Sequence, residues 1–222
     1  MLQRINKKFF FYISLIIILG TFNNKNLKNF DLPKIDIVNI EGIEFDNDEF
    51  LKITNLIKLN NLLSIQKSQI KEILNSNNLI EEYEVFKRYP SSLEIKIKKT
   101  NFLASTNFDG KNYLVGSNGK FINSKDHSQN LPFIFGNFES EKFLEFKNII
   151  LQTDLKYNNI KNFYYFPSGR WDIEMISGVL IKLPITGIKK SLNLSIDLLD
   201  DIEFSNIKVL DKRQKNQIVI ND

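Results

Sequence analysis

The chain has 222 residues, 42% of them hydrophobic, which is enough for one large domain or two small ones. It contains no cysteine, so disulfides, thiolate nucleophiles and cysteine-ligated metals are excluded. The formal charge is +4, but five basic residues precede the first acid, Asp31, and the sequence from residue 29 onward carries about −1, which excludes the broad basic surface of a nucleic-acid-binding protein.

The first apolar segment runs from Phe9 to Phe22 without a charged residue. As a helix it would span about 21 Å, against roughly 30 Å of bilayer hydrocarbon, so three interpretations compete: a retained signal anchor, a cleaved signal peptide and a buried core helix. The residues after Gly20 lack the small-x-small pattern of a cleavage site, and the segment has no polar stripe. We therefore predict a transmembrane anchor over 9–22. Residues 1–8 form a cytoplasmic tail, because Arg4, Lys7 and Lys8 favour the cytoplasmic side.

A small α+β module is predicted after a polar linker over 23–34. Residues 35–42 alternate between apolar and polar side chains up to a glycine, which predicts a strand. Residues 46–57 have a helical apolar pattern with a cap at Asp46 or Asn47, and residues 64–74 show a second such pattern.

A hairpin over 83–99 closes this module. Tyr89-Pro90-Ser91-Ser92 has the chemistry of a tight turn. After it, Leu93, Ile95 and Ile97 alternate with charged residues, as a strand buried on one side requires. The predicted order over 35–99 is strand, helix, helix, strand, strand.

From Thr100 onward glycine and proline interrupt short apolar stretches, which is typical of a β meander. Two helices are predicted within it, over 139–157 and 188–200. The predicted late strands are Trp171–Met175, Val179–Leu183, Ile207–Leu210 and Ile218–Ile220. The fold class is therefore α+β, with a mostly β second domain over 100–222 that carries two helices.

No arrangement of residues predicts catalysis. His127, the only histidine, lies in a polar stretch that reads as a surface loop. Residues 116–120 lack the glycine and hydroxyl residue of a phosphate-binding loop, so they predict a turn. Glu81-Glu82 and Asp200-Asp201 are adjacent pairs, which on a strand point to opposite faces. We predict a non-enzymatic protein without cofactor, metal or small-molecule substrate.

Several motifs follow one another along the chain. Residues 85–97 are similar to the pattern V-x-R-x-W/Y-P-x-x-L-x-I-x-V, with Lys87 at the arginine and Ile97 at the last valine, and residues 113–121 are similar to L-V-D-x-x-G-x-x-F. Residues 131–136 are similar to L-P-x-L-x-G, residues 170–184 to R-W-x-L-x-L-x-x-G…L-P, and residues 210–220 to D-L-R…I-x-V. In this order, with an apolar segment before them, the motifs resemble the FtsQ/DivIB family of bitopic bacterial cell-division proteins.

The resemblance implies a scaffold of the divisome in the cell inner membrane, at the division septum. Its N-terminus would be cytoplasmic and its bulk periplasmic, with a POTRA domain over 35–99. The resemblance also implies that the β-domain binds FtsB and FtsL by strand addition.

The predicted partner-binding residues lie in the last strand and in two of the motifs. A terminal edge strand offers unpaired backbone groups to a partner, and 217–220 contains no proline; an interior closing strand fits equally well. Trp171, the only tryptophan, is expected in the core or at an interface. The predicted residues are Arg213, Gln217, Ile218, Val219, Ile220, Arg170 and Trp171.

Two alternative functions remain open. A membrane-anchored periplasmic cell-wall hydrolase would need a cleft containing a carboxyl group with a raised pKa. A POTRA-bearing secretion or assembly factor would be expected to carry tandem POTRA modules.

Overall fold

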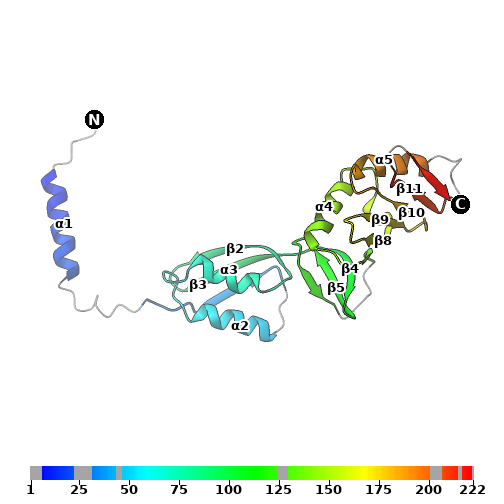
Figure 1. Ribbon diagram of the computed structural model, residues 1–222. Helices are drawn as coiled ribbons and strands as arrows, with labels where there is room; N and C mark the ends of the chain where they lie inside the picture. The colour runs from blue at the N-terminus through cyan, green and yellow to red at the C-terminus, as the bar shows by residue number, and fades with distance from the viewer. Residues whose placement is uncertain are drawn as a thin grey trace. The chain divides into compact units, whose positions relative to one another are not determined.

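The computed structural model describes residues 7–22, 32–43, 47–124, 130–200, 207–214 and 217–221 (Figure 1). The chain divides into two compact units whose segments alternate along the sequence. The first unit comprises residues 1–39, 45–67 and 86–94, and the second comprises residues 40–44, 68–85 and 95–222. His127 and Asp201 lie outside the described residues.

The apolar segment predicted over 9–22 is helical. Helix α1 runs from Lys7 to Phe22, and its described side chains are exposed. Among the helices of the described residues, none is both long enough and apolar enough to traverse a bilayer.

The predicted order strand, helix, helix, strand, strand is confirmed. It consists of β1 (Ile37–Glu41), α2 (Asn47–Lys58), α3 (Lys67–Asn75), β2 (Ile80–Arg88) and β3 (Ser92–Lys99). The strands form a three-stranded sheet of order β1-β3-β2, and one boundary between the two units falls inside each of these strands. Leu93, Ile95 and Ile97 are buried, as their alternation predicts.

The second unit contains a nine-stranded sheet of order β12-β11-β10-β9-β8-β7-β4-β5-β6. Its strands are β4 (Phe102–Phe108), β5 (Lys111–Gly116), β6 (Phe121–Asn123), β7 (Phe133–Phe135), β8 (Ile160–Tyr165), β9 (Trp171–Met175), β10 (Leu180–Lys182), β11 (Val209–Asp211) and β12 (Val219–Asn221). The mixed α+β class is thus confirmed.

The predicted meander is wrong for part of this sheet. β4 pairs with β7, β7 with β8 and β10 with β11 in parallel. Parallel neighbours require a crossover connection. Helix α4 (Ser140–Ile150) connects β7 to β8, and helix α5 (Ile188–Leu199) connects β10 to β11.

Helix α4 is also shorter than the predicted 139–157. It ends at Ile150, whose carbonyl accepts a hydrogen bond of 2.7 Å from the Thr153 hydroxyl. The chain then turns so that Leu155 enters the core at 6% exposure. A 3₁₀ turn, η2 (Tyr157–Asn159), leads into β8.

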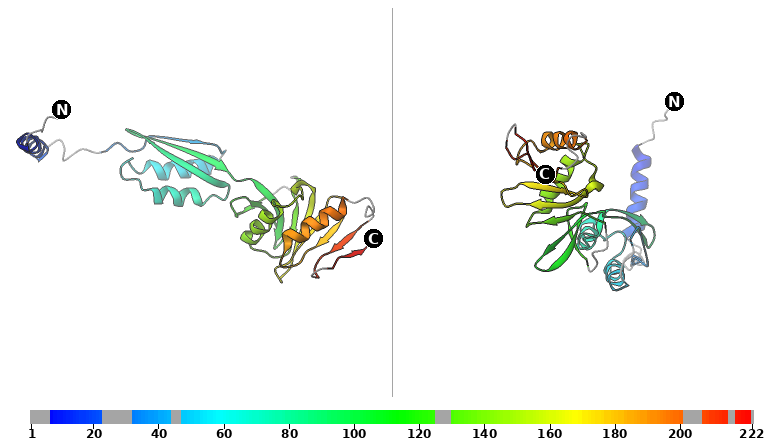
Figure 2. Two further views of the ribbon diagram at one scale, coloured as in Figure 1. Left: turned by 90° about the horizontal axis from the view of Figure 1, so that it is seen from above. Right: turned by 90° about the vertical axis from the view of Figure 1, so that its right-hand side faces the viewer.

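Both helices pack against one face of this sheet (Figure 2). Aromatic rings fill the space between α4 and the sheet. Phe146 stacks on Trp171 with ring centroids 4.9 Å apart, and Phe143 meets Phe163 edge to face at 5.6 Å. This core fixes β8 and β9, from which the sheet extends toward β12.

Candidate functional site

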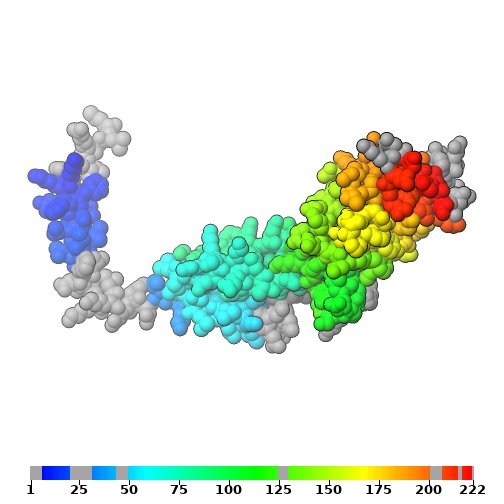
Figure 3. Space-filling model, in the orientation of Figure 1, coloured from blue at the N-terminus to red at the C-terminus, as the bar shows by residue number. Residues whose placement is uncertain are grey.

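The last strand, β12, lies at one margin of the nine-stranded sheet. It pairs antiparallel with β11, placing Ile220 opposite Leu210 and Val219 opposite Asp211. In the part of the chain that the structure describes, no strand lies on the other side of β12. Figure 3 shows these C-terminal residues, in red, on the surface of the second unit. The backbone of β12 can therefore accept another strand.

The side chains of this strand divide between core and solvent. Ile220 is half-buried and packs against the core, whereas Val219 is 55% exposed. Ile218, directly before the strand, is 39% exposed. Ile220 thus packs β12 against the core, while Val219 and the preceding Ile218 remain available for contact.

The backbone directions along β12 alternate as well. The Lys208 N–H donates to the Asn221 carbonyl at 3.0 Å, so the polar groups of Asn221 face β11. Because successive residues of a strand direct their polar groups to opposite sides, those of Val219 also face β11. The N–H and carbonyl of Ile220 then face the open margin.

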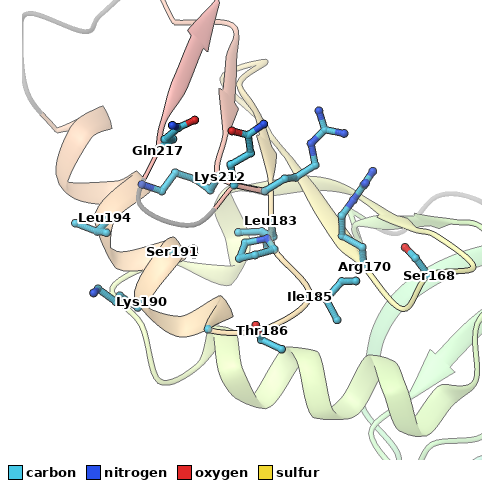
Figure 4. A pocket seen from close by; sticks show the side chains of 14 residues that line it. Ser168, Arg170, Leu183, Ile185, Thr186, Lys190, Ser191, Leu194, Lys212 and Gln217 are labelled. Atoms are coloured by element: carbon cyan, nitrogen blue, oxygen red, sulfur yellow. The ribbon is translucent and has the colours of Figure 1, made fainter.

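A groove of about 770 Å³ lies at the end of the sheet where β12 begins: Gln217 lines it, and no residue of β12 does. Its walls come from the β10–α5 connection, the first turns of α5, the segment after β11, and the turn before β9. Four of its described lining residues are basic and none is acidic; the basic ones are Arg170, Lys190, Lys212 and Arg213. Figure 4 shows Arg170, Lys190, Lys212 and Gln217 around this space.

Two of the four cations are paired with carboxylates. Arg170 binds Asp172 through contacts of 3.1 and 3.2 Å, and its guanidinium lies 4.0 Å from the centre of the Phe166 ring. Burial raises the pKa of Asp172, while the Leu183 N–H and the Arg170 charge oppose that rise. The Arg213 guanidinium donates hydrogen bonds to both carboxylate oxygens of Asp211, and these bonds lower the pKa of Asp211.

Lys212, unlike Arg170 and Arg213, is a buried lysine. Its side chain is only 7% exposed, although it lines the groove. Burial lowers the pKa of Lys212, and the ammonium group of Lys190 lowers it further. Because Arg170 and Arg213 are paired with carboxylates, the positive charge that the groove retains comes from Lys190 and Lys212.

Most of the predicted site residues come together here. Arg170, Arg213 and Gln217 line the groove, and Val219 and Ile220 follow Gln217 in β12.

Trp171 is the exception and requires a correction. It is 3% exposed and stacks on Phe146, so it belongs to the core and cannot touch a partner.

Sequence patterns missed the contribution of α5. Lys190 and Ser191 reach the groove only because α5 returns the chain from β10 to β11. The two consecutive cations Lys212 and Arg213, directly after an apolar strand, were the signal that could have extended the prediction.

Two of the stretches considered for chemistry make structural contacts in the described part of the chain. Within the described ranges, no three His, Asp or Glu side chains come together as metal ligands. Residues 117–119 form the turn between β5 and β6, and the Ser117 hydroxyl donates to Glu81 at 2.6 Å. Glu81 is thus occupied by a structural contact.

Comparisons with known proteins agree on one family. The family model described as "Cell division protein FtsQ/DivIB, C-terminal" matches residues 104–213. "Cell division protein FtsQ" of Rickettsia bellii (strain RML369-C) is 24% identical over 191 residues, which cover 84% of this chain and 72% of that protein. "Cell division protein DivIB" of Clostridium botulinum (strain Loch Maree / Type A3) is 29% identical over 151 residues, 65% of this chain and 55% of that protein.

Among solved structures, a match is the major extracytoplasmic domain of the trans isomer of the cell-division protein DivIB from Geobacillus stearothermophilus. It is 14% identical with a TM-score of 0.35, and the match covers 50% of this chain and 99% of that one.

Proposed function

Because this chain belongs to the FtsQ/DivIB family of cell-division proteins, we propose that it is a non-enzymatic scaffold of the divisome, anchored in the inner membrane. It links septal division proteins through the parts of the chain outside the cytoplasm. FtsB and FtsL are the proposed partners.

The observation that carries this proposal is the open margin of β12. A partner strand placed there would gain main-chain hydrogen bonds, and the exposed Val219 and Ile218 would select its side chains. The basic groove at the end where β12 begins would favour a partner with acidic residues near its strand.

Helix α1 is the proposed anchor. Its sixteen residues span about 24 Å, a few ångströms less than the hydrocarbon core. Lys7 and Lys8 at its start would extend their side chains toward the headgroups, and local thinning of the bilayer would accommodate the remaining difference. The basic N-terminus then stays in the cytoplasm. The rest of the chain lies in the periplasm and consists of the proposed POTRA domain over 35–99 and the second domain over 100–222.

A hydrolase receives no support from the groove. The carboxyl group with a raised pKa near it, Asp172, is 3% exposed and already binds Arg170 and the Leu183 N–H. No acidic residue lines the described groove to act with it. An acid–base pair would need two carboxyl groups open to substrate.

A proline substitution at the margin tests the scaffold role. Ile220→Pro removes the N–H that faces the open side and keeps the N–H groups that face β11, so the sheet should survive. Ile220→Ala is the matched control, since it also loses the packed side chain but retains the N–H. The measurement is capture of the FtsB–FtsL pair by the tagged full chain extracted from membranes.

We expect the proline variant to lose capture by at least about tenfold, and the alanine variant to retain most of it. Equal capture by the two variants, at equal thermal stability, would refute strand addition at β12.

A further inference from the structure

One end of the first unit is assembled from three chain segments, which we call the tip: residues 32–36, 58–65 and 87–91. The Ile35 N–H donates to the Asn60 carbonyl, and the Asp36 N–H donates to the Ser91 carbonyl, each at 2.9 Å. The Lys87 ammonium donates to the Leu62 carbonyl at 2.6 Å. These bonds join the incoming chain, the α2–α3 turn and the β2–β3 turn, which lie at the same end of this unit in Figure 1.

The tip exposes large apolar side chains on all three segments. Leu59 is 71% exposed, Leu63 is 63% exposed and Tyr89 is 66% exposed, with Leu32 at 37% on the incoming segment. A single exposed leucine needs no explanation. Their recurrence on three segments that hydrogen bonds hold together indicates a surface that meets something apolar.

Basic side chains outnumber acidic ones around these residues, and Asp36 is the exposed acid within the tip. Lys34, Lys58 and Lys67 are exposed on the same segments or directly beside them. Leucines flanked by lysines, with a tyrosine at the edge, are the composition of surfaces that insert shallowly into anionic bilayers. A partner protein's apolar patch would match the leucines and leave the three ammonium groups without a counterpart.

The path of the chain supplies the reason to choose a bilayer. Only the nine residues 23–31 separate the end of α1 at Phe22 from Leu32. Fully extended, they reach at most about 30–36 Å. Because Ile35 and Asp36 are hydrogen-bonded into the tip, an anchored α1 would keep the tip within that distance of the membrane.

We propose that the tip is a membrane-contacting surface, in which Leu59 and Leu63 enter the headgroup region of an anionic bilayer and Lys34, Lys58 and Lys67 bind its lipid phosphates. This inference rests on the anchoring proposed above. It assigns a second attachment to the membrane, which would fix the orientation of the first unit on the bilayer.

Site-specific fluorescence tests the contact, because the chain contains no cysteine. Leu59→Cys and Leu63→Cys are labelled with an environment-sensitive dye in the full chain, reconstituted into vesicles of phosphatidylethanolamine and phosphatidylglycerol. Ile176→Cys, at a position that is 65% exposed in the second unit, is the matched control. Leu15→Cys in α1 reports on the anchor itself.

We expect lipids that carry a quencher to quench the dyes at 59 and 63 at least about twofold more than the dye at 176. Replacing phosphatidylglycerol by phosphatidylcholine should weaken this difference. Quenching at 15 without excess quenching at 59 and 63 would overturn the tip contact and leave the anchor standing.

Absence of quenching at 15 would instead overturn the anchor, and the tip contact with it. A blue shift at 59 and 63 that appears only when the FtsB–FtsL pair is added would assign the surface to a protein and refute the lipid contact.

Discussion

Glu174 gathers three hydrogen-bond donors on one carboxylate. The Tyr164 hydroxyl donates at 2.6 Å, the Asn162 amide at 2.8 Å and the Lys161 ammonium at 3.0 Å. These donors lower the pKa of Glu174 to about 2, with the Tyr164 bond as the largest cause. Since Tyr164 and Asn162 lie on β8 and Glu174 on β9, the carboxylate ties the two central strands together.

This cluster predicts the acid sensitivity of the fold. With a lowered pKa in the folded chain, Glu174 stabilises the protein at pH values above its unfolded value near 4.5, and this contribution disappears as the pH falls toward 2. Glu174→Gln should lower the unfolding free energy at pH 7 by about 1–2 kcal/mol and flatten its decline below pH 4.5. Urea unfolding at several pH values measures both effects.

An exposed carboxylate provides the comparison. Glu145, paired with Lys142 on the surface of α4, should change the unfolding free energy by less than about 0.5 kcal/mol when replaced by glutamine. A decline below pH 4.5 as steep in Glu174→Gln as in the original chain would show that the cluster does not stabilise the fold.

At the residue scale, the sequence predicted which side chains are buried in a strand better than it predicted which side chains bind a partner. The period of two placed Leu93, Ile95 and Ile97 in the core correctly because the pattern is local. For Trp171 the sequence left the core and an interface open, because its stacking partner Phe146 lies twenty-five positions away on a helix whose packing no local pattern indicates.

At the scale of the elements, their order was predictable and their pairing was not. Helical and strand periods identified α2, α3, β2 and β3 within a few residues. The parallel pairing of β4 with β7 joins residues about thirty positions apart, so the local sequence of neither strand predicts it. The edge position of β12 follows from that same non-local order, which is why an interior strand was an equal alternative.

The turn after β7 shows how tightly the parallel strands approach. Gly136 has a φ of +103°, and a Cβ atom there would lie 2.2 Å from the Tyr165 carbonyl oxygen at the end of β8. Gly136→Ala should therefore destabilise the fold by about 2–4 kcal/mol, from backbone strain together with the clash. Thermal unfolding of the full chain measures the loss.

Gly110, in the β4–β5 turn, separates these two causes. It also has a positive φ, +75°, but a Cβ atom there would meet nothing within 4 Å. Gly110→Ala should cost only the strain, about 1 kcal/mol. Equal losses in the two variants would mean that β7 and β8 do not pack as closely as the structure places them.

At the scale of the whole molecule, the anchor can be tested by charge. The apolar residues of α1 contribute about −5 kcal/mol to membrane insertion, and one arginine at the centre of a span costs about 3 kcal/mol. Leu15→Arg with Ile16→Arg should move the full chain from the membrane fraction into the supernatant of an alkaline wash. The double alanine variant should stay with the membrane, and retention of the arginine variant would contradict anchoring by α1.

Family membership was predictable at this scale because it depended on the order of weak motifs along the chain rather than on any one of them. The groove could not be predicted from the sequence, because its walls come from segments near residues 170, 187 and 213 that only the folded sheet brings together.

The length of the nine-stranded sheet has a geometric consequence. Neighbouring strands rotate by about 20–25° relative to each other, so eight steps from β6 to β12 accumulate roughly 160–200°. At this average twist the two outer strands would differ in direction by roughly half a turn. A partner strand added to β12 would continue this rotation away from β6. A partner bound at β12 would therefore leave the β6 edge of the sheet accessible.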